Sequence, residues 1–250
     1  MLNIMLCGCG GRMGAAVIAA ATASGDRIVA GVDINPAADS PFPIFTSPED
    51  FAGKADVIID FSHHSALPGL LTYAAKTATP LVVCTTGHTE EELGAMREAS
   101  ERVGVFFSRN MSLGINLLIS LCRRAAATLG ADFDIEIIEK HHNKKLDAPS
   151  GTALMIADAL AADGDEHPYV YDRHAVRRQR ERGEIGLHAV RGGTIVGEHE
   201  VLFCGKDEII TLSHSAASRE VFATGALRAA HFMKDKGAGF YNMDDVVGNL

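Results

Sequence analysis

The segment EIIEKHHNKKLDAPSGTA, residues 136–153, gathers side chains that could perform acid–base chemistry on an anionic substrate. His141 and His142 carry imidazoles, and imidazole is the side chain that ordinarily exchanges a proton near neutral pH. Lys144 and Lys145 supply positive charge for a carboxylate or for anionic character that develops during a reaction. The segment therefore predicts a place where a small, negatively charged molecule is held and protonated.

The end of the same segment predicts a helix N-terminus that binds an anion. Ser150 follows Pro149 and is a residue type that caps helices. The backbone N–H groups of Gly151 and Thr152 should then point out of the first turn, where a carboxylate is the expected ligand. Asp147 is expected to pair with a lysine or to brace the loop.

Two other interpretations of the segment remain open. His141, His142 and Glu139 could ligate a metal, but adjacent residues on a strand point to opposite faces and no further ligand spacing is present. We therefore predict no metal. The segment could also be a charged surface loop that precedes a capped helix.

The sequence CGCGGRMG, residues 7–14, follows an apolar run and opens a helix-like one. Gly8, Gly10 and Gly14 form the pattern GxGxxxG, with an additional Gly11. Glycine permits a tight turn and lets backbone N–H groups approach a pyrophosphate, whose charge the helix N-terminus favours. This arrangement predicts a dinucleotide site.

Asp33 ends the second strand-like run, where the acid that binds the adenosine ribose hydroxyls should lie. No Arg or Lys follows nearby to meet the 2′-phosphate of NADPH, so the sequence favours NADH or the use of both nucleotides. A cation could still arrive from elsewhere in the fold. A glycine turn beside a solvated aspartate is the alternative interpretation.

Short apolar runs alternate with helix-like runs through the first half of the chain. Strands are expected at residues 2–7, 27–33, 56–61, 80–86 and 103–108, and helices at 12–24, 66–78 and 89–102. Strands of this length that alternate with helices predict βαβ units. The expected fold is therefore α/β, with a Rossmann-like, doubly wound parallel sheet covered on both faces.

The pattern changes after about Ser112. The expected elements are a helix at 113–130, strands at 133–139, 184–190, 194–204 and 207–214, and a final helix at 218–236 before a polar tail. Consecutive strands without helices between them predict an α+β domain with an open mixed sheet. Residues 171–183 hold five Arg and few apolar residues, and we expect them to form a solvent-exposed loop.

The composition argues against several classes of protein. A formal net charge of −9 over 250 residues disfavours a nucleic-acid binder. No apolar run reaches the roughly 18 residues needed to span a bilayer. The apolar residues 1–7 are expected to form a strand rather than a signal peptide. Five scattered Cys without metal spacing are expected to be reduced thiols in a cytoplasmic protein.

Residues 136–153 match every fixed position of E-x-x-E-x-H-H-x-x-K-x-D-x-P-S-G-T-A, the signature of the 4-hydroxy-tetrahydrodipicolinate reductase (dihydrodipicolinate reductase) family. The GCGGRMG turn resembles the nucleotide loop of that family. The blocks DFS, TTG, NMSLGINLL and IGLHAVRGGTIVGEHEV resemble further parts of it. The chain is therefore similar to that family over nearly its whole length.

The resemblance implies an NADH- or NADPH-dependent oxidoreductase of the diaminopimelate route to lysine. Such an enzyme delivers hydride to C4 of a cyclic imine dicarboxylate and protonates C3. The family implies His141 as the acid–base residue and Lys145 as a residue that assists protonation and holds the substrate. Further substrate contacts are implied for His142, Ser150, Gly151 and Thr152. The implied nucleotide contacts are Gly8, Cys9, Gly10, Gly11, Arg12, Met13, Asp33, Cys84, Thr85, Thr86, Ser108, Arg109, Asn110 and Met111.

The resemblance also implies how the chain is divided. Residues 1–112 and 220–250 would form the dinucleotide-binding domain, and residues 113–219 would form a substrate and oligomerisation domain. The second domain would build a homotetramer through its sheet, and domain closure would bring hydride donor and acceptor together. The residues alone leave two rivals open: an NAD-dependent dehydrogenase of another small acid, and a non-catalytic dinucleotide-sensing protein.

Overall fold

The computed structural model describes residues 1–35, 40–161, 169–175 and 177–248. The chain divides into two compact units, the first made of Met1–Leu113 and Arg219–Leu250 and the second of Gly114–Ser218. The C-terminal part of the chain thus completes the first unit, although it follows the second in sequence.

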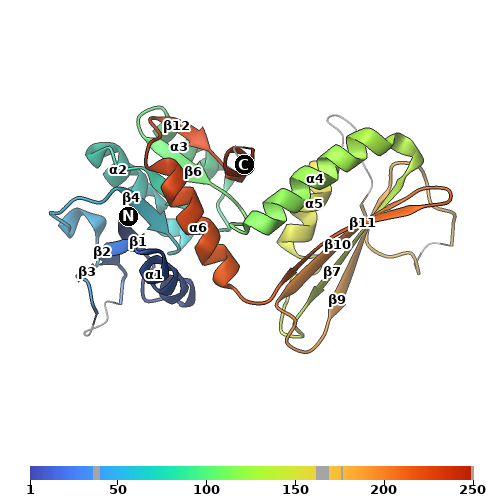
Figure 1. The fold of residues 1–250 in the computed structure, drawn as a ribbon, viewed down its shortest axis with the longest axis horizontal. Helices are drawn as coiled ribbons and strands as arrows, with labels where there is room; N and C mark the ends of the chain where they lie inside the picture. Colours follow the sequence, from blue (N-terminus) through green and yellow to red (C-terminus); the bar gives the residue numbers. More distant parts are fainter. Residues whose placement is uncertain (36–39, 162–168, 176, 249–250) are drawn as a thin grey trace. The chain divides into compact units, whose positions relative to one another are not determined.

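In the described part of the first unit, seven strands form one sheet in which every adjacent pair is parallel (Figure 1). The strand order is β12-β6-β5-β4-β1-β2-β3. Their bounds are β1 Asn3–Cys7, β2 Arg27–Val32, β3 Ile44–Phe45, β4 Val57–Asp60, β5 Leu81–Val83, β6 Gly104–Phe107 and β12 Gly239–Tyr241. The central strands consist mainly of Val, Ile and Leu because both faces of a parallel sheet are covered. The predicted doubly wound parallel sheet is confirmed.

Helices cover both faces of this sheet: α1 and α6 pack on one, and α2 and α3 pack on the other (Figure 1). Their bounds are α1 Arg12–Ser24, α2 Leu67–Thr77, α3 Glu90–Ser100 and α6 Glu220–Met233. Ile58 and Ile59 are neighbours on β4, yet they belong to the two different cores. Successive side chains of a strand point to opposite faces, so each strand fills both cores.

The tail expected after residue 236 forms two short elements that the sequence pattern did not indicate. β12 extends the sheet at its edge, where Gly239 lies opposite Gly104 of β6. Helix α7, Met243–Val247, buries Met243 and Val246 in the core beneath α1 and α6. A strand of three residues is too short to show an alternating pattern, so its conformation depends on the pairing itself.

In the described part of the second unit, five strands form a mixed sheet of order β11-β10-β7-β9-β8. β10 is antiparallel to β7 and β11, whereas β9 is parallel to β7 and β8. The bounds are β7 Asp134–His141, β8 Tyr169–Val170, β9 Ile185–Arg191, β10 Gly197–Cys204 and β11 Ile209–Ala216. The parallel pair β7 and β9 requires a crossover connection, and helix α5 forms part of it. The predicted open mixed sheet is confirmed.

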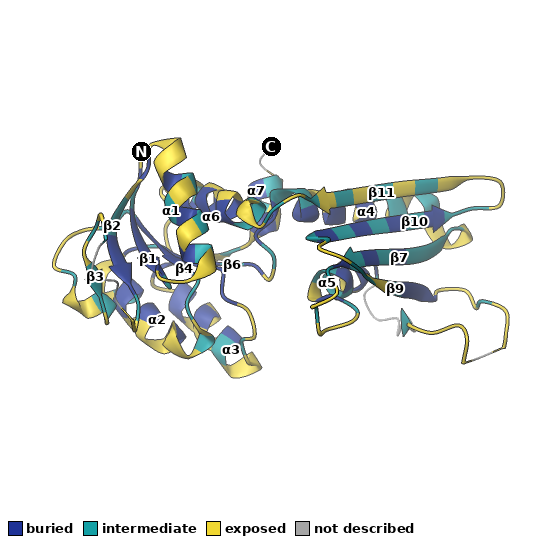
Figure 2. Ribbon diagram, turned by 90° about the horizontal axis from the view of Figure 1, so that it is seen from below, coloured by how far each residue is buried: buried dark blue, intermediate teal, exposed yellow. Residues whose placement is uncertain are grey.

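One face of this sheet is covered by helices α4, Leu113–Leu129, and α5, Gly151–Leu160. Ile137, Val201 and Phe203 are almost fully buried beneath them. Buried and half-buried residues alternate along β10, and exposed and half-buried residues alternate along β11 (Figure 2). The buried side chains of β7, β9 and β10 therefore lie on the face beneath the helices.

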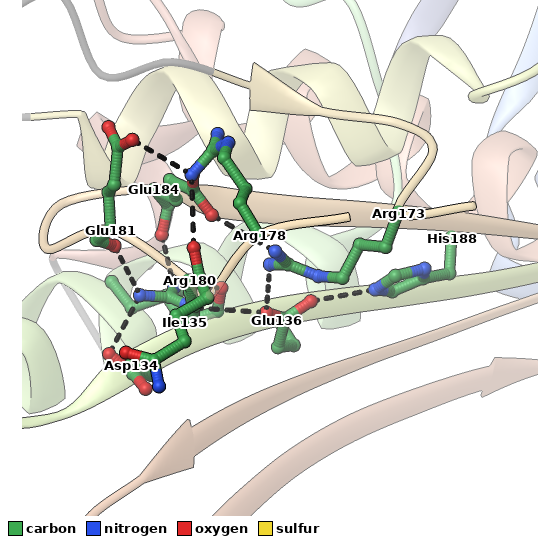
Figure 3. Close-up of polar contacts among 10 residues, drawn as sticks. Asp134, Ile135, Glu136, Arg173, Arg178, Arg180, Glu181, Glu184 and His188 are labelled. Carbon is green, nitrogen blue, oxygen red and sulfur yellow. Dashed lines mark hydrogen bonds and ion pairs between the residues drawn. The ribbon is translucent and has the colours of Figure 1, made fainter. Parts of the chain in front are cut away.

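The described residues of the segment 171–183 are exposed, as expected, except for half-buried Arg180, and several of its arginines are anchored by ion pairs (Figure 3). Arg173 contacts Glu184 at 3.0 Å and Glu136 at 2.8 Å, and Arg178 contacts Glu184 at 2.5 Å. Arg180 contacts Asp134 of β7 at 2.7 Å. The side chain of Glu184 is fully buried, so these cations supply the compensation that a buried carboxylate requires. The arginines thus tie the segment to β7 and to the start of β9.

No helix in the described part of the chain is both long enough and apolar enough to cross a membrane.

Candidate active site

The glycine turn follows β1 and opens α1, where only glycine fits at two positions. Gly8 has φ +76°, and a Cβ there would lie 2.5 Å from the carbonyl oxygen of Phe61. A Cβ at Gly14 would lie 2.4 Å from the carbonyl oxygen of Gly8. The N–H of Gly11 donates to that same oxygen at 3.1 Å. The turn thus brings backbone close to the helix N-terminus, which is the geometry that suits a pyrophosphate.

Asp33, directly after β2, holds this turn from the side. Its Oδ2 accepts the N–H of Gly10 at 2.9 Å, and its Oδ1 accepts the N–H of Asn35 at 3.0 Å. Both Asp33 and the glycine turn line a cavity of about 880 Å³ at the carboxyl ends of β1, β2 and β4. None of the described residues that line it is Lys or Arg.

The cavity also has lining residues that the sequence did not single out. They come from the loops after β3 and β4 and include Thr46, Ser47, Ser62, His63 and Ser65. Ser62 lies in the block DFS that resembles the family, but no motif marks the other four, and all of them meet Asp33 only because the carboxyl ends of parallel strands lie at one edge of the sheet.

Several implied nucleotide contacts have side chains that point away from solvent. Cys9, Cys84 and Met111 are buried in the apolar core, so a bound molecule could contact their backbone but not their side chains. Thr85 is buried and donates from Oγ1 to Asp60 at 2.9 Å. Residues 84–86 and 108–111 follow β5 and β6 and lie outside the lining of the 880 Å³ cavity.

The remaining implied nucleotide contacts lie at the start of α1 and in the loops after β5 and β6, and they differ in exposure. Arg12 and Thr86 are exposed, whereas Met13 packs partly against the core. Ser108 and Asn110 form a compact turn in which the Ser108 hydroxyl donates to the Asn110 carbonyl at 2.8 Å. Arg109 between them is exposed, which leaves its guanidinium accessible to a ligand.

We expect Asp33→Ala to raise the NADH KM by about 10-fold or more, because a charged hydrogen-bond acceptor contributes roughly 1.5–3 kcal/mol. The turnover number should change far less, since the adenosine ribose is remote from the reacting carbon. The measurement is NADH KM from initial rates together with NADH Kd from fluorescence titration. Asp50→Ala removes an exposed carboxylate from the same unit and is the control. An unchanged NADH KM for Asp33→Ala would remove the ribose contact.

A second site lies on the helix-covered face of the mixed sheet. Glu139 and His141 are two residues apart on β7, so both side chains point to the buried face. The strand register places Arg191 of β9 opposite His141, and His199 of β10 opposite Glu139. Three strands thus bring four ionisable side chains to one place.

Glu139 accepts hydrogen bonds from three different elements. Oε2 lies 2.6 Å from His141 Nδ1, and the Arg191 guanidinium donates to both carboxylate oxygens at 2.7 and 2.6 Å. The backbone N–H of Ser150 donates to Oε1 at 2.9 Å. Burial raises the pKa of Glu139, but the hydrogen bonds from Arg191, His141 and Ser150 outweigh it and hold that pKa below its ordinary value. Glu139 is therefore an ionised carboxylate at neutral pH.

His199 stands beside this carboxylate as a neutral imidazole. Its Nε2 lies 3.1 Å from the Ser150 hydroxyl, and its ring meets the His141 ring edge-on with centroids 5.3 Å apart. Burial first, and then the nearby charge of His141, lowers the pKa of His199 to about 4. His141 consequently has a buried, uncharged neighbour on one side and a carboxylate on the other.

His199 should make the protein lose stability as the solution is acidified. Its pKa is about 4 in the folded state and near 6.5 when exposed, so the unfolded chain binds more protons between these values. The contribution is complete above pH 6.5 and is lost as the pH falls towards 4, by at most roughly 3 kcal/mol. We expect thermal melts of His199→Gln to show a smaller loss of Tm between pH 7 and pH 4.5 than the wild type. An identical loss in both proteins would contradict this assignment.

The start of α5 has the predicted cap. The Ser150 hydroxyl accepts the N–H of Ala153 at 3.1 Å, and the helix begins at Gly151. Lys145 Nζ lies 2.8 Å from Asp147 Oδ1, which confirms the expected pairing of Asp147 with a lysine. The hydrogen bond from Lys145 lowers the pKa of Asp147. A cation and a capped helix N-terminus therefore lie in the loop that leads from His141 into α5.

Some of the residues implied for the substrate are linked by hydrogen bonds to Glu139, and others lie in the loop after β7. His141, Ser150 and the first turn of α5, which contains Gly151 and Thr152, are joined through Glu139. His142 follows the end of β7 and is half-buried, and its carbonyl accepts the N–H of Lys145 at 3.1 Å. Among the described residues, no group of three His, Cys, Asp or Glu side chains is placed to hold a metal ion.

Sequence reasoning did not assign a role to Arg191 or His199. They lie 52 and 60 residues after Glu139, and neither belongs to the 136–153 segment. Both lie in the block IGLHAVRGGTIVGEHEV, whose resemblance to the family named no role for either of them, and alternation along β9 and β10 puts them on the face that Glu139 shares. Which residue stands opposite which depends on strand register, and the sequence does not show it.

The first unit has the architecture of a dinucleotide-binding fold: a parallel sheet, a glycine turn after its first strand and an acid after its second. Solved dehydrogenase structures from Thermotoga maritima and Mycobacterium smegmatis share this fold at TM-scores of 0.61 and 0.65 and 10% identity. The chain belongs to the dihydrodipicolinate reductase family. The family's N-terminus matches residues 2–111, and its C-terminus matches residues 114–247.

Full-length relatives agree with this family. The 4-hydroxy-tetrahydrodipicolinate reductase of Caldanaerobacter subterraneus is 52% identical over 99% of this chain and 98% of its own. That of Clostridium botulinum is 49% identical over 99% of both chains. A dipicolinate-bound dihydrodipicolinate reductase from Paenisporosarcina sp. TG-14 superposes with a TM-score of 0.81 at 25% identity, covering 97% of each chain. The family expected from the sequence is confirmed.

Proposed function

We propose that this protein reduces 4-hydroxy-tetrahydrodipicolinate to tetrahydrodipicolinate with NADH or NADPH, as a step of diaminopimelate and lysine biosynthesis. One observation carries the proposal: the match to reductases of that name extends over the whole chain, including the complete 136–153 segment. The site around Glu139 supports it, because a proton-exchanging imidazole lies in the same hydrogen-bonded cluster as a capped helix N-terminus.

Each substrate-side residue has a role that fits its place. Loss of water from the 4-hydroxy compound leaves an unsaturated cyclic imine dicarboxylate, to whose C4 a bound nicotinamide supplies hydride. His141 donates the proton that C3 then requires. Lys145 and the N–H groups of Gly151 and Thr152 bind the carboxylates, with His142 and Ser150 beside them. Lys145 is paired with the Asp147 carboxylate in this structure. When substrate binds, a substrate carboxylate takes the place of Asp147 as the partner of the Lys145 ammonium.

We propose that NADH is used at least as well as NADPH. The support is the cavity around Asp33, whose described lining residues include no Lys or Arg for a 2′-phosphate. Asp33 lines that cavity, and each of its carboxylate oxygens accepts one backbone hydrogen bond. Each oxygen has a second lone pair that could accept a ribose hydroxyl.

The test follows the oxidation of NADH and of NADPH by the loss of nicotinamide absorbance. Substrate is generated in situ from pyruvate and aspartate semialdehyde by the preceding synthase, and a reaction without the synthase is the control. Turnover with NADH at least equal to that with NADPH is expected. A strong preference for NADPH would keep the reaction and overturn the nucleotide proposal. Tight nucleotide binding without turnover would favour the dinucleotide-sensing alternative.

We also propose a homotetramer assembled through the second sheet, in the cytoplasm. The face of that sheet opposite α4 and α5 carries half-buried Ile138 and Leu202 beside the Lys140–Glu200 ion pair of 2.9 Å, a mixture suited to an interface. All five cysteines are free and four are buried, which supports a reducing compartment. Light scattering after size exclusion should give four times 26.5 kDa, and a monomer mass would refute the assembly.

A further inference from the structure

Glu139 is the junction of the substrate-side site. Its carboxylate accepts from a side chain of its own strand, from β9 and from the start of α5, and it is fully inaccessible to solvent. Nη2 of Arg191, which donates to Oε1 of Glu139, also donates to the Asp147 carbonyl at 2.6 Å. One carboxylate therefore connects His141, the lysine-bearing loop and the helix N-terminus.

We propose that Glu139 is a positioning residue for His141: it holds Nδ1 and thereby makes Nε2 the atom that exchanges a proton with the substrate. The proposal rests on the function proposed above. Arg191 in turn holds Glu139, because its two parallel hydrogen bonds prevent the carboxylate from rotating away from the imidazole.

The chemistry of the pair decides which nitrogen reacts. An ionised carboxylate has no hydrogen to donate, so Nδ1 carries one in both protonation states of the imidazole. Nε2 alone then gains and loses a proton. When the Nε2 proton passes to C3 of the substrate, a neutral imidazole remains, whose Nδ1–H still donates to Glu139. Solvent restores the lost proton before the next turnover.

Gly197 at the start of β10 keeps Nε2 approachable. A Cβ at this position would lie 3.1 Å from His141 Nε2 and 3.4 Å from Cδ2. These distances are tighter than ordinary contacts, so a methyl group would cover the reacting nitrogen or turn the ring. Glu139 and Gly197 thus act on the two nitrogens of one ring, the first by holding Nδ1 and the second by leaving space beside Nε2.

The first experiment compares Glu139→Gln with Glu139→Asp in the full-length protein. A glutamine cannot accept all the hydrogen bonds that Glu139 accepts, and its amide would donate to Nδ1 and move the hydrogen to Nε2. We expect kcat to fall about 100-fold at neutral pH, with NADH Kd within about two-fold of the wild type. The side-chain nitrogen resonances of His141 should change from the Nδ1–H to the Nε2–H pattern. Glu139→Asp keeps the charge and should restore the Nδ1–H pattern and part of kcat.

The second experiment is independent of any unfolding caused by a change at Glu139. Gly197→Ala should lower kcat about 10-fold with little change in Tm, because the three atoms nearest to the added methyl all belong to the imidazole of His141. Gly192→Ala is the matched control, since nothing lies within 4 Å of where its Cβ would be. It should leave kcat and Tm unchanged.

Two results would overturn the proposal. One is wild-type kcat in Glu139→Gln with the Nδ1–H pattern retained, and the other is full activity in Gly197→Ala. Failure of the proposed function would look different. The wild type would then not turn over 4-hydroxy-tetrahydrodipicolinate, while the His141 resonances would still show Nδ1–H and would still respond to Glu139→Gln.

Discussion

His141→Gln is expected to lower kcat by roughly 100- to 10,000-fold, the range that general acid–base catalysis contributes. The substrate KM should change by only about three-fold or less, because glutamine is similar in length and cannot donate a proton to carbon. Steady-state rates at saturating NADH measure both constants. The buried surroundings of His141 should tolerate this substitution, since the glutamine amide can donate to Glu139 in place of Nδ1–H.

His142→Gln is the comparison for this variant. His142 lies one residue further along, beyond the end of β7, and does not share the buried face with Glu139. We expect it to raise the substrate KM more than it lowers kcat, as the loss of a carboxylate contact would. An unchanged kcat in His141→Gln would remove His141 from the mechanism. Equal effects of the two variants would mean that the buried pair with Glu139 has no special role.

Gly225→Ala is expected to lower Tm by about 6–12 °C, which corresponds to roughly 3 kcal/mol for a protein of this size. Gly225 lies within α6, and a Cβ there would lie 1.7 Å from the carbonyl oxygen of Met111. The obstacle is backbone rather than a flexible side chain, so α6 and the segment after β6 must separate. Thermal unfolding followed by circular dichroism measures the loss. NADH Kd should weaken as well, because Met111 belongs to the segment with implied nucleotide contacts.

Gly94→Ala is the matched control for this change. Gly94 lies in the middle of α3 on its exposed side, and nothing lies within 4 Å of where its Cβ would be. Alanine should stabilise that helix by about 0.5–1 kcal/mol because it loses less backbone entropy on folding. A Tm for Gly225→Ala equal to that of Gly94→Ala would contradict the close approach of α6 to Met111.

Several elements were predictable because their signals are local in the chain. The helix predicted at 12–24 is α1, Arg12–Ser24, and the parallel strands β1, β2 and β4 lie within the apolar runs predicted for them. The short strands β3, β8 and β12 were not predicted. Two or three residues carry no period, and these segments become strands only because a neighbouring strand offers them hydrogen bonds.

The candidate sites divide in the same way. The glycine turn, the acid at Asp33 and the cap at Ser150 are neighbours in sequence of the elements they serve, so spacing alone indicated them. Cys9, Cys84 and Met111 were implied as nucleotide contacts, yet their side chains face the core. A motif names consecutive residues, whereas the direction of each side chain depends on the strand end or turn that it occupies.

The sequence by itself determined that this protein has a dinucleotide-type α/β unit, a second mixed-sheet unit and a histidine–lysine segment before a capped helix. Those features follow from periodicity and spacing within short stretches of chain. Only the tertiary structure decided that Glu139 meets Arg191, that His199 stands beside His141, and that Gly197 leaves space at Nε2. Their distances in sequence are bridged by strand register, which is set by the packing of the whole sheet and not by any one of its strands.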